Sequence, residues 1–363
     1  MDYKLLFEVS VYRKDRISSD KVDKENYIST ENMLPNRGGV EIATTVASAK
    51  MFPAYKKGDI LLSNIRPYFK KIWYADKEGG CSNDVLVVKG NKTVDNKFLY
   101  YVLSDNNFFN YSTVTSKGTK MPRGSKNAIM KYWIPDLDLP TQRKIADILS
   151  SYDELIKANN ERIELLEQAA QELYKEWFVR FRFPGYENAK FEDGIPEGWE
   201  CCRLGKILSF GAGKTRPKSG ETYPVYGGNG ILDYCNNYNS ENAIIIGRVG
   251  VYCGTVYYEP DKCWISDNAL FAESKNSMHF YNYYLLKNMN LNARQIGTGQ
   301  PLITQGLLNK IRILLPSESL MMKYNQIASE LLKQQDLLRK MNVNIAAQRD
   351  MLLPRLMSGK LEV

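Results

Sequence analysis

Apolar residues recur with a helical period over one long stretch of the chain, from Thr141 to Phe183. Steps of seven residues select one set of mostly apolar positions, and the positions four residues further on supply its companions. The first set is Ile145, Tyr152, Asn159, Leu166 and Leu173, and the second is Leu149, Ile156, Ile163, Ala170 and Trp177. Since neither proline nor glycine interrupts the stretch, it predicts one exposed helix about 60 Å long with a narrow apolar seam and Thr141 as its N-cap.

A second stretch, which begins at Ser317, repeats this pattern near the end of the chain. Its seven-residue series is Tyr324, Leu331, Leu338, Ile345 and Leu352, with Ile327 and Met341 beside it. The first helix leads from one region to the next, and the second helix starts where that next region ends, so covering both seams requires antiparallel helices. Asn159 and Gln334 place a polar residue in each seam, where it either fixes the register or faces water at a break.

On either side of the first long stretch, the pattern changes to short apolar segments bounded by turn residues. Residues 1–139 contain the apolar runs Ile60–Ile65 and Val85–Val88, which predict strands, and Asn96–Asn106, which predicts a helix. Residues 184–316 show the same pattern of short apolar segments bounded by turn residues, after Pro184 and Gly185 end the helix. Two compact, β-rich domains are therefore expected.

The second of these regions repeats the first. Matched segments in the same order are Leu6–Val9 with Leu204–Ile207, Ile60–Arg66 with Ile244–Arg248, Ala75–Lys77 with Pro260–Lys262, Ser82–Leu86 with Ser266–Leu270, Gly118–Pro122 with Gly297–Pro301, and Leu139–Pro140 with Leu315–Pro316. The match ending at Arg66 and Arg248 needs a gap before the arginine. A shared order of short matches indicates an internal duplication.

The expected fold is therefore α+β, with two related β-rich domains separated by two long antiparallel coiled-coil helices and related by a pseudo-two-fold axis. The predicted segments are a first domain at 1–139, a central spacer helix at 140–183, a second domain at 184–316 and a C-terminal spacer helix at 317–363.

Composition narrows the class of protein. The chain has 363 residues, 44% hydrophobic content and a formal charge of +8, which favours an acidic partner only weakly. No apolar run approaches the length of a membrane span, and charged residues near Met1 argue against a leader, so a cytoplasmic protein without a membrane partner is expected. The six cysteines form no C-x-x-C pair, which indicates reduced thiols rather than disulfides or a zinc site.

The sequence lacks the residues that several classes of catalytic site require. The single histidine, His279, excludes a histidine-based triad or a multi-histidine metal site and is predicted to be a surface or helix-cap residue. Gly213-Lys214-Thr215 resembles the end of a phosphate-binding loop, but Leu208 stands where that loop needs glycine. Methyltransferase signatures are missing too, so the chain is expected not to transfer methyl groups itself.

One catalytic alternative stays open. Asp261, Glu273 and Lys275 match the short acidic signature of a metal-dependent nuclease superfamily, in which two carboxylates and a lysine hold Mg²⁺ and orient water. The pattern is short, the chain is rich in these residue types, and the matching segment of the first region, which carries Asp76, ends at Val88-Lys89 without the glutamate. An ordinary surface strand pair is therefore the better explanation.

Basic, amide and aromatic side chains gather in glycine-containing loops of both regions. Lysine and arginine neutralise phosphates, whereas arginine, glutamine and asparagine pair with base edges. The candidate DNA-binding residues are Arg66, Lys70, Lys71, Lys117, Lys120, Arg123, Lys126, Lys214, Arg216, Lys218, Tyr226, Asn229, Arg248, Arg294, Thr298 and Gln300. Two such sets joined by a rigid spacer predict a reader of two separated half-sites in double-stranded DNA.

The segment Leu139–Leu149, continued by Leu155-Ile156 and Glu172–Phe178, resembles the central helical region of type I restriction-modification specificity subunits. Other segments resemble motifs of that family's target recognition domains and its C-terminal end; they are Pro224–Ile231, Ile246–Gly250, Ser266–Leu270 and Leu353–Gly359. The likeness weakens in the first region, where Tyr27–Asn32 replaces the glycine-rich Tyr226–Gly230 and Ile65-Arg66-Pro67 departs from the Gly-Arg-x-Gly form. The two domains should therefore read different sequences.

The resemblance implies a non-catalytic subunit in which each domain reads one half of a bipartite, asymmetric DNA target. It also implies that the helices set the gap between the halves and dock two modification subunits, which methylate adenine, and through them the restriction subunits. No cofactor is expected in this chain. S-adenosylmethionine, ATP and Mg²⁺ would belong to the partner subunits.

Overall fold

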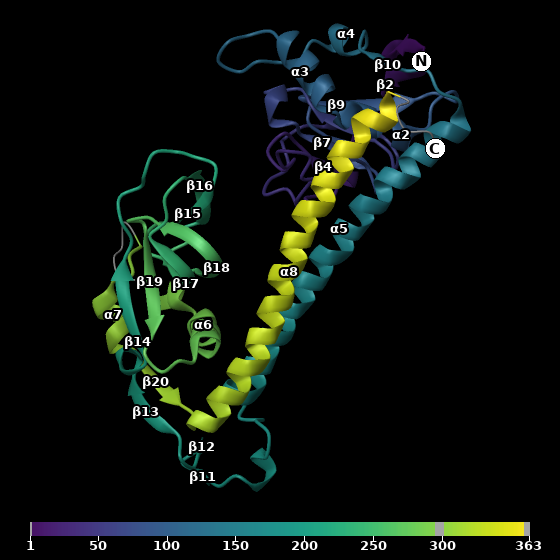
Figure 1. Ribbon diagram of the computed structural model, residues 1–363. Coiled ribbons are helices and arrows are strands. Elements are labelled where there is room, and N and C mark those ends of the chain that lie inside the picture. Colours follow the sequence, from purple (N-terminus) through teal and green to yellow (C-terminus); the bar gives the residue numbers. More distant parts are fainter. Residues whose placement is uncertain (1, 295–300, 359–363) are drawn as a thin grey trace. The chain divides into compact units, whose positions relative to one another are not determined.

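The computed structural model describes residues 2–294 and 301–358, and its chain divides into two compact units. Unit 1 comprises Met1–Lys157 and Asn342–Val363, and unit 2 comprises Ala158–Met341. Each unit thus contains one end of each long helix together with a β-rich body (Figure 1).

Unit 1 is built on two four-stranded sheets and one short strand pair. The first sheet has the order β2-β9-β6-β7, with bounds Ser10–Tyr12, Val85–Gly90, Ile60–Ser63 and Ile72–Tyr74. The second has the order β3-β5-β8-β4, with bounds Arg16–Ser18, Met51–Tyr55, Gly79–Cys81 and Tyr27–Ile28. The pair joins β1 (Tyr3–Leu5) to β10 (Trp133–Pro135).

Most helices of unit 1 begin where a polar side chain caps them. They are α1 (Leu6–Val9), α2 (Asn96–Ser104), α3 (Asn106–Val114) and α4 (Lys126–Ile129), with 3₁₀ turns η1 (Ser19–Lys21) and η2 (Pro67–Phe69). The helix expected over Asn96–Asn106 is present as α2 but ends at Ser104, because Asp105 is extended and its carboxylate accepts the N–H of Asn107 at 2.7 Å. That cap starts a second helix instead.

Unit 2 contains one six-stranded sheet of order β14-β19-β17-β18-β15-β16. Its strands are Leu208–Ala212, Ala269–Ser274, Ser240–Gly247, Val256–Ile265, Tyr223–Gly227 and Gly230–Cys235. Short pairs join β13 (Glu200–Arg203) to β20 (Arg312–Leu315) and β11 (Phe191–Glu192) to β12 (Ile195–Pro196). The helical elements are α6 (His279–Asn288), α7 (Gln305–Lys310), η4 (Tyr186–Asn188), η5 (Leu204–Lys206) and η6 (Leu291–Arg294).

The central strand of each unit is apolar on both faces, as burial on both sides requires. In β17, Ile244 and Ile246 join the large core while Ile245 joins a smaller cluster on the other face. In β6, Leu61 likewise faces away from the core that contains its neighbours in the strand. Continuous apolar runs in the sequence therefore mark the middle of each sheet.

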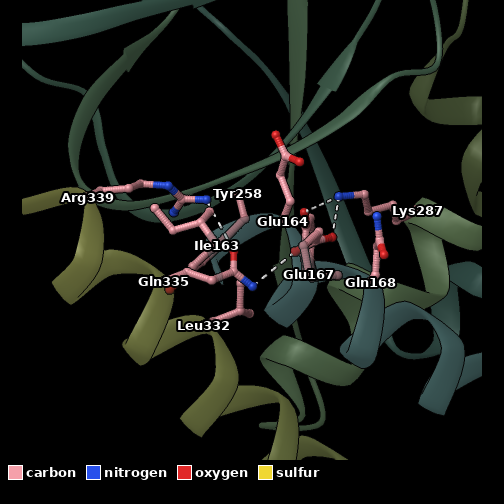
Figure 2. A pocket seen from close by; sticks show the side chains of 10 residues that line it. Ile163, Glu164, Glu167, Gln168, Tyr258, Lys287, Leu332, Gln335 and Arg339 are labelled. Carbon is pink, nitrogen blue, oxygen red and sulfur yellow. Dashed lines mark hydrogen bonds and ion pairs between the residues drawn. The ribbon is translucent and has the colours of Figure 1, made fainter. Parts of the chain in front are cut away.

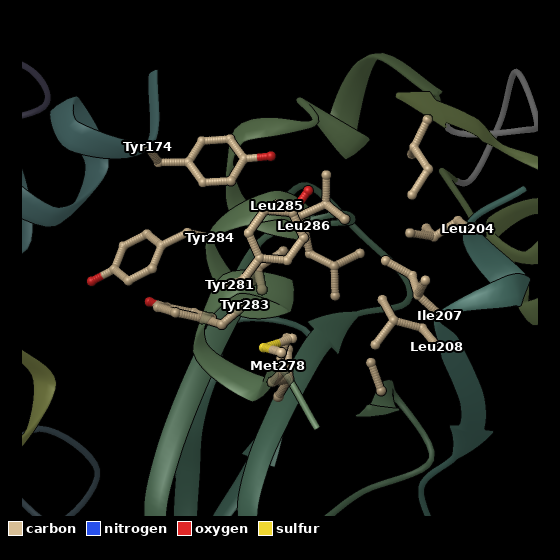
Figure 3. Packing of buried hydrophobic residues seen from close by; sticks show 14 of the residues in the cluster. Tyr174, Leu204, Ile207, Leu208, Met278, Tyr281, Tyr283, Tyr284, Leu285 and Leu286 are labelled. Carbon is tan, nitrogen blue, oxygen red and sulfur yellow. The ribbon is translucent and has the colours of Figure 1, made fainter. Parts of the chain in front are cut away.

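A group of tyrosines lies in the large core of unit 2, beside leucines and isoleucines (Figure 3). Tyr281 and Tyr284 of α6 lie near Tyr174 of the first long helix, and leucine and isoleucine side chains fill the opposite side. Tyr324 of the second long helix joins them, and its hydroxyl donates to the carbonyl of Ala170 at 2.9 Å. Both long helices thus pack into the core of this unit.

The long helices are α5 (Leu139–Tyr174) and α8 (Glu318–Met357). A π-helical turn, η3 (Lys175–Val179), extends α5 but stops short of the expected end at Phe183. The N-cap prediction for Thr141 is wrong, because the carboxylate of Asp138 accepts the N–H of Thr141 at 2.9 Å. Pro140 then lies in the first turn, where its missing N–H costs nothing.

The polar seam residues behave differently from each other. Asn159 is only 7% exposed, as a residue that fixes register would be. Gln334 is exposed, whereas its neighbour Gln335 is fully buried. Of the two interpretations of Gln334, the water-facing one is therefore correct, and Gln335 is the buried polar residue of that helix.

Strand pairing repeats between the units residue by residue. Leu62 pairs with Leu86 in unit 1, and Ile246 pairs with Leu270 in unit 2, with both partners displaced by 184 positions. The parallel pair Ile28 and Cys81 has the counterpart Tyr226 and Ile265, displaced by 198 and 184. The same register corrects the sequence alignment at one point: the counterpart of Arg248 is Asn64, not Arg66.

Throughout the part of the chain that the structure describes, no helix combines the length and the apolarity that crossing a membrane requires.

Candidate nucleic-acid interface

Three loops of unit 2 meet at the ends of strands β15, β17 and β19. The backbone N–H of Arg248 donates to the carbonyl of Asn268 at 3.0 Å, and the N–H of Ser266 donates to the carbonyl of Tyr226 at 2.9 Å. The loop that begins at Lys214 joins them, because the N–H of Lys214 donates to the carbonyl of Ile265 at 3.0 Å. The sequence motifs from three separate stretches therefore form one cluster, the unit 2 loop cluster.

Glycines make this close approach possible. A Cβ on Gly213 would lie 2.0 Å from the carbonyl oxygen of Ser266. A Cβ on Gly247 would lie 2.6 Å from the carbonyl oxygen of Gly228. Both are backbone contacts that cannot move aside, so the glycine-rich motifs have a packing role in addition to any role in binding.

Arg248 lies at the centre of the unit 2 loop cluster and is partly buried. Its Nε is shielded from solvent and has no hydrogen-bond partner among the described residues, while Nη1 reaches the carbonyl of Asp267 at 3.5 Å. A buried donor of this kind carries a desolvation cost that a bound acceptor would relieve. Arg248 is thus the best-placed of the predicted arginines in this unit to receive a ligand.

The remaining cations of unit 2 differ in how they are held. Lys214 and Lys218 are exposed. Arg216 pairs with the carboxylate of Asp233, which also accepts the hydroxyl of Ser219 at 2.6 Å. The Ser219 bond, the backbone and Arg216 lower the pKa of Asp233 to about 2. Arg216 is therefore partly neutralised in the free protein.

Two of the predicted residues lie near the β15–β16 turn: Tyr226 in the last part of β15 and Asn229 in the turn itself. Tyr226 is 7% exposed, and its hydroxyl donates to Glu259 Oε2 at 2.8 Å. Burial, together with the Glu259 charge, raises the pKa of Tyr226. Asn229, by contrast, is exposed at the tip of the turn. The structure directs Tyr226 inward and leaves Asn229 available to a ligand.

Of the last three predicted residues of unit 2, Arg294 is described and ends η6. Arg294 is exposed, and its Nε donates to the carbonyl of Met289 at 3.4 Å. Thr298 and Gln300 lie outside the described residues. Where the description resumes, Leu302 pairs with Val249, so this part of the chain adjoins Arg248.

In unit 1, the two basic loops also come together. The N–H of Arg66 donates to Pro122 at 2.8 Å, and Ile65 forms a bridge with Arg123. The N–H of Gly124 donates to Asn64 at 2.9 Å, which matches the bond from Ile303 to Arg248 in unit 2. The unit 1 loop cluster, formed by residues 64–71 and 116–126, therefore occupies the position of the unit 2 loop cluster.

Some cations of unit 1 are held by the protein. Lys70 donates to Asn106 Oδ1 at 2.9 Å, and Lys71 donates to the carbonyl of Thr30 at 2.6 Å. Burial lowers the pKa of Lys71. Arg123 forms a half-exposed ion pair with Asp84 at 3.2 Å.

The other predicted cations of unit 1 are Lys117, Lys120 and Lys126, and all are exposed. Arg66 has a left-handed backbone with φ 51°, and its Nε is buried without a partner among the described residues. The exposed lysines suit phosphate contact, whereas the inner arginine suits a more selective contact.

Sequence reasoning missed two inner positions. The side chains of Asn64 and Ser266 are buried, and Asn64 Oδ1 and Ser266 Oγ lack hydrogen-bond partners among the described residues. The sequence did contain a signal for Asn64. The matched segments that begin at Ile60 and Ile244, and at Ser82 and Ser266, are each separated by 184 positions, and the same separation aligns Asn64 with Arg248 without a gap.

The nuclease residues are not brought together. Asp261 pairs with Lys340 at 3.0 Å, and Lys275 donates to the carbonyl of Gly205 at 2.7 Å. Glu273 lies on β19, separated from the strand of Asp261 by β17. Among the described residues no group of histidine, cysteine, aspartate and glutamate is arranged to hold a metal ion. The geometry gives this alternative no support.

His279 and the cysteines are structural. His279 opens α6, where it is partly buried against Tyr258 and Phe280 at ring distances of 5.6 and 5.4 Å. Burial lowers the pKa of its imidazole. The six cysteines are unpaired in the structure, and all but Cys201 are buried.

The chain matches a sequence model described as "Type I restriction modification DNA specificity domain" over residues 6–168 and 196–343. It is 26% identical over 381 residues to the type I restriction enzyme MjaIX specificity subunit of Methanocaldococcus jannaschii, covering 94% of this chain and 85% of that protein. It is 26% identical over 400 residues to the MjaVIII specificity subunit of the same organism, covering 97% and 91%.

Among solved structures, the type I restriction-modification S subunit from M. genitalium is similar, with a TM-score of 0.57 and 18% identity. The match covers 98% of this chain and 96% of that one. At this identity the likeness concerns the fold.

Proposed function

We propose that this chain, which belongs to the type I restriction-modification DNA specificity family, is the subunit that reads the DNA target of such a system. The observation that carries the proposal is the repeated loop cluster. In each unit, basic loops converge on the same strand register around one inner polar residue, Asn64 or Arg248. Exposed cations around an inner polar residue are suited to hold a backbone while base edges are read.

Each unit then reads one half of a bipartite, asymmetric target. Arginine pairs best with guanine and asparagine with adenine in the major groove. Since the inner position is asparagine in unit 1 and arginine in unit 2, the two half-sites differ. The recognition domains are residues 1–139 and 184–316, and the candidate DNA contacts are those predicted from sequence, with Tyr226 acting only as support.

The two long helices form the antiparallel spacer that sets the gap, at 140–183 and 317–363. Within unit 1, Asp153 of α5 pairs with Arg349 of α8. Within unit 2, Glu167 of α5 accepts a hydrogen bond from Gln335 of α8 at 3.3 Å. Going from one contact to the other advances 14 residues on α5 and retreats 14 on α8, which is what one continuous antiparallel register requires.

Partner subunits dock on the outer surface of these helices. Apolar side chains remain exposed there in the free chain: Ile148, Leu155, Leu165, Ile327, Leu337, Met341, Val343 and Met351. We assign this surface to two modification subunits, which bring S-adenosylmethionine, and through them to restriction subunits that use ATP and Mg²⁺. The chain itself is a non-catalytic, cytoplasmic subunit.

The test is to co-express the chain with its modification subunit and to map methylated adenines by sequencing. One bipartite motif with a fixed gap is expected, and it should be absent when the modification subunit is expressed alone. Methylation without any bipartite motif would refute the proposal.

A further inference from the structure

A carboxylate of α5 is the meeting point of three helices in unit 2. Glu167 accepts hydrogen bonds from Lys287 of α6 at 2.5 Å and from Gln335 of α8 at 3.3 Å (Figure 2). It also accepts the hydroxyl of Tyr284, on α6, at 3.0 Å. Burial raises the pKa of Glu167, but Lys287 and the hydrogen bonds outweigh that effect and leave the pKa below its ordinary value. The carboxylate is therefore charged and held from both sides.

A cavity of about 340 Å³ adjoins this carboxylate, between the α5 and α8 segments and the body of unit 2. Figure 2 shows Arg339 pointing toward Gln335, and its guanidinium donates to Gln335 Oε1 at 3.2 Å. The amide of Gln335 is thereby oriented so that its NH₂ group faces Glu167. This arrangement makes the contact between α5 and α8 directional rather than merely apolar.

Unit 1 contains an equivalent arrangement. The carboxylate of Asp153 on α5 accepts the hydroxyl of Tyr101 on α2 at 2.6 Å and pairs with Arg349 on α8. Arg349 also pairs with Asp350 at 2.8 Å, and Asp350 in turn pairs with Arg37 of the β-rich body at 3.2 Å. As in unit 2, one carboxylate ties a body helix, α5 and α8 together.

The two carboxylates also select one register of the helices. If α8 slipped by one heptad in one direction, Asp153 would face Leu356 and Glu167 would face Asn342. In the other direction, Glu167 would face Ala328 and Asp153 would face Asn342. Each carboxylate would keep its partners on the body helix, but either slip places an apolar side chain, Leu356 or Ala328, where α8 supplies a donor to it. A partly buried carboxylate that loses a charged or amide donor is destabilised, so both slipped registers are disfavoured. Apolar seam residues alone do not distinguish heptad registers in this way.

We propose that Asp153 and Glu167 are positioning residues that fix each β-rich body on the helix pair and so restrict the protein to one gap between half-sites. This inference rests on the proposed function. A duplex with a mis-spaced target can be bound only if a body tilts or shifts on its helices. That movement must first break a carboxylate contact, so these contacts convert a spacing error into a loss of binding.

The experiment measures the gap between methylated half-sites for the chain in complex with its modification subunit. The variants are Tyr101→Phe and Tyr284→Phe, which each remove one hydroxyl, and Asp153→Asn and Glu167→Gln, which remove the charges. Glu164→Gln is the matched control, because Glu164 is an exposed residue of the same helix. Adenine methylation is then scored on a plasmid library that carries the wild-type half-sites at every gap from three base pairs shorter to three longer.

We expect the wild-type and Glu164→Gln complexes to methylate one gap. The four other variants should methylate unchanged half-sites at neighbouring gaps as well, with the preference for the wild-type gap reduced about tenfold, as the loss of one buried hydrogen bond implies. A merely stabilising role would lower the unfolding temperature without broadening the gap distribution.

Thermal unfolding of each complex accompanies the measurement, and the tyrosine variants decide the question if a charge-removing variant does not fold. Folded variants that keep a single gap, or that lose methylation equally at all gaps, would overturn the inference while leaving the proposed function intact. Gap broadening by Glu164→Gln equal to that of Glu167→Gln would overturn it too. A wild-type complex without a bipartite motif would instead refute the proposed function.

Discussion

Units 1 and 2 share a strand framework but differ in the loops that it supports. After β4, the side chain of Asn32 is buried and bonds to Ser29 N–H at 2.6 Å and to the carbonyl of Glu41 at 2.8 Å. At the corresponding point of unit 2, the chain turns through Gly227 and Gly230 into the β15–β16 hairpin. The strand pairs that the two units share keep one register although their loops differ, so that register does not depend on the sequence of the loops.

The inner residues differ in charge, Asn64 in unit 1 and Arg248 in unit 2, whereas the cations around them are alike. Each unit has exposed cations and one arginine paired with an aspartate, Arg123 with Asp84 and Arg216 with Asp233. Phosphate attraction should therefore be similar at the two units, and unit 2 should differ in its close-packed glycine turns.

The largest expected effect comes from placing a residue of unit 1 at the matching position of unit 2, which tests whether unit 2 requires its glycine there. Gly247 corresponds to Ser63 in the shared register, so Gly247→Ser introduces the unit 1 residue. Its Cβ would meet the carbonyl of Gly228 at 2.6 Å, and we expect unit 2 to lose about 1–3 kcal/mol of unfolding free energy.

Chemical denaturation measures this loss. The control is Gly306→Ala, because a Cβ there has no neighbour closer than 3.9 Å. If Gly247→Ser were as stable as that control, the close approach of the two backbones would not be what requires glycine.

The next largest effect is expected on base discrimination, when the inner residue Arg248 or Asn64 is replaced. Arg248→Ala should cost about 1–3 kcal/mol of discrimination at one base of one half-site, because a bidentate contact to a base edge is lost. Competition binding against single-base variants of the target measures it. Arg216→Ala, which removes an already paired exposed cation, is the control and should leave base preference unchanged.

Asn64→Ala should act in the same way on the other half-site only. An effect on the half-site of unit 2 would contradict the assignment of one half-site to each unit.

A smaller effect is expected for the outer lysines. Lys120→Ala in unit 1 and Lys218→Ala in unit 2 should weaken binding to all sequences alike and reduce the salt dependence by about one phosphate contact each. Titrations at several salt concentrations with matched and mismatched duplexes test this. A selective loss at matched sites alone would mean that these lysines read bases.

Much of this framework could be predicted from periodicity. The heptad spacing of Ile145 and Leu149 and the apolar run of β17 both depend on burial, which leaves a regular pattern in sequence. The first residues of the helices were harder to predict. Asp105 and Asp138 act as caps through their side chains, and neighbouring polar residues such as Thr141 could have capped the same helices.

The candidate site was predictable as a set of loops but not as an arrangement. Tyr226 and Asn229 belong to one motif, yet the structure buries the first and exposes the second. Asn64 carries no charge and escaped a search for basic residues, although the strand register identifies it. Contacts between distant segments decide these orientations, and spacing along the chain does not encode them.

The smallest expected effect concerns pH, and it separates the units because the chain has one histidine, in unit 2. Burial lowers the pKa of His279, and the start of α6 also disfavours a positive charge. As pH falls through about 6.5, the ordinary histidine value, the unfolded chain binds a proton more readily than the folded one, so the stability of unit 2 decreases. His279→Gln should remove this loss between pH 7.5 and 5.5 in thermal unfolding, while Asn276→Ala nearby keeps it. A variant that retained the wild-type slope would show that other groups govern the acid sensitivity of unit 2.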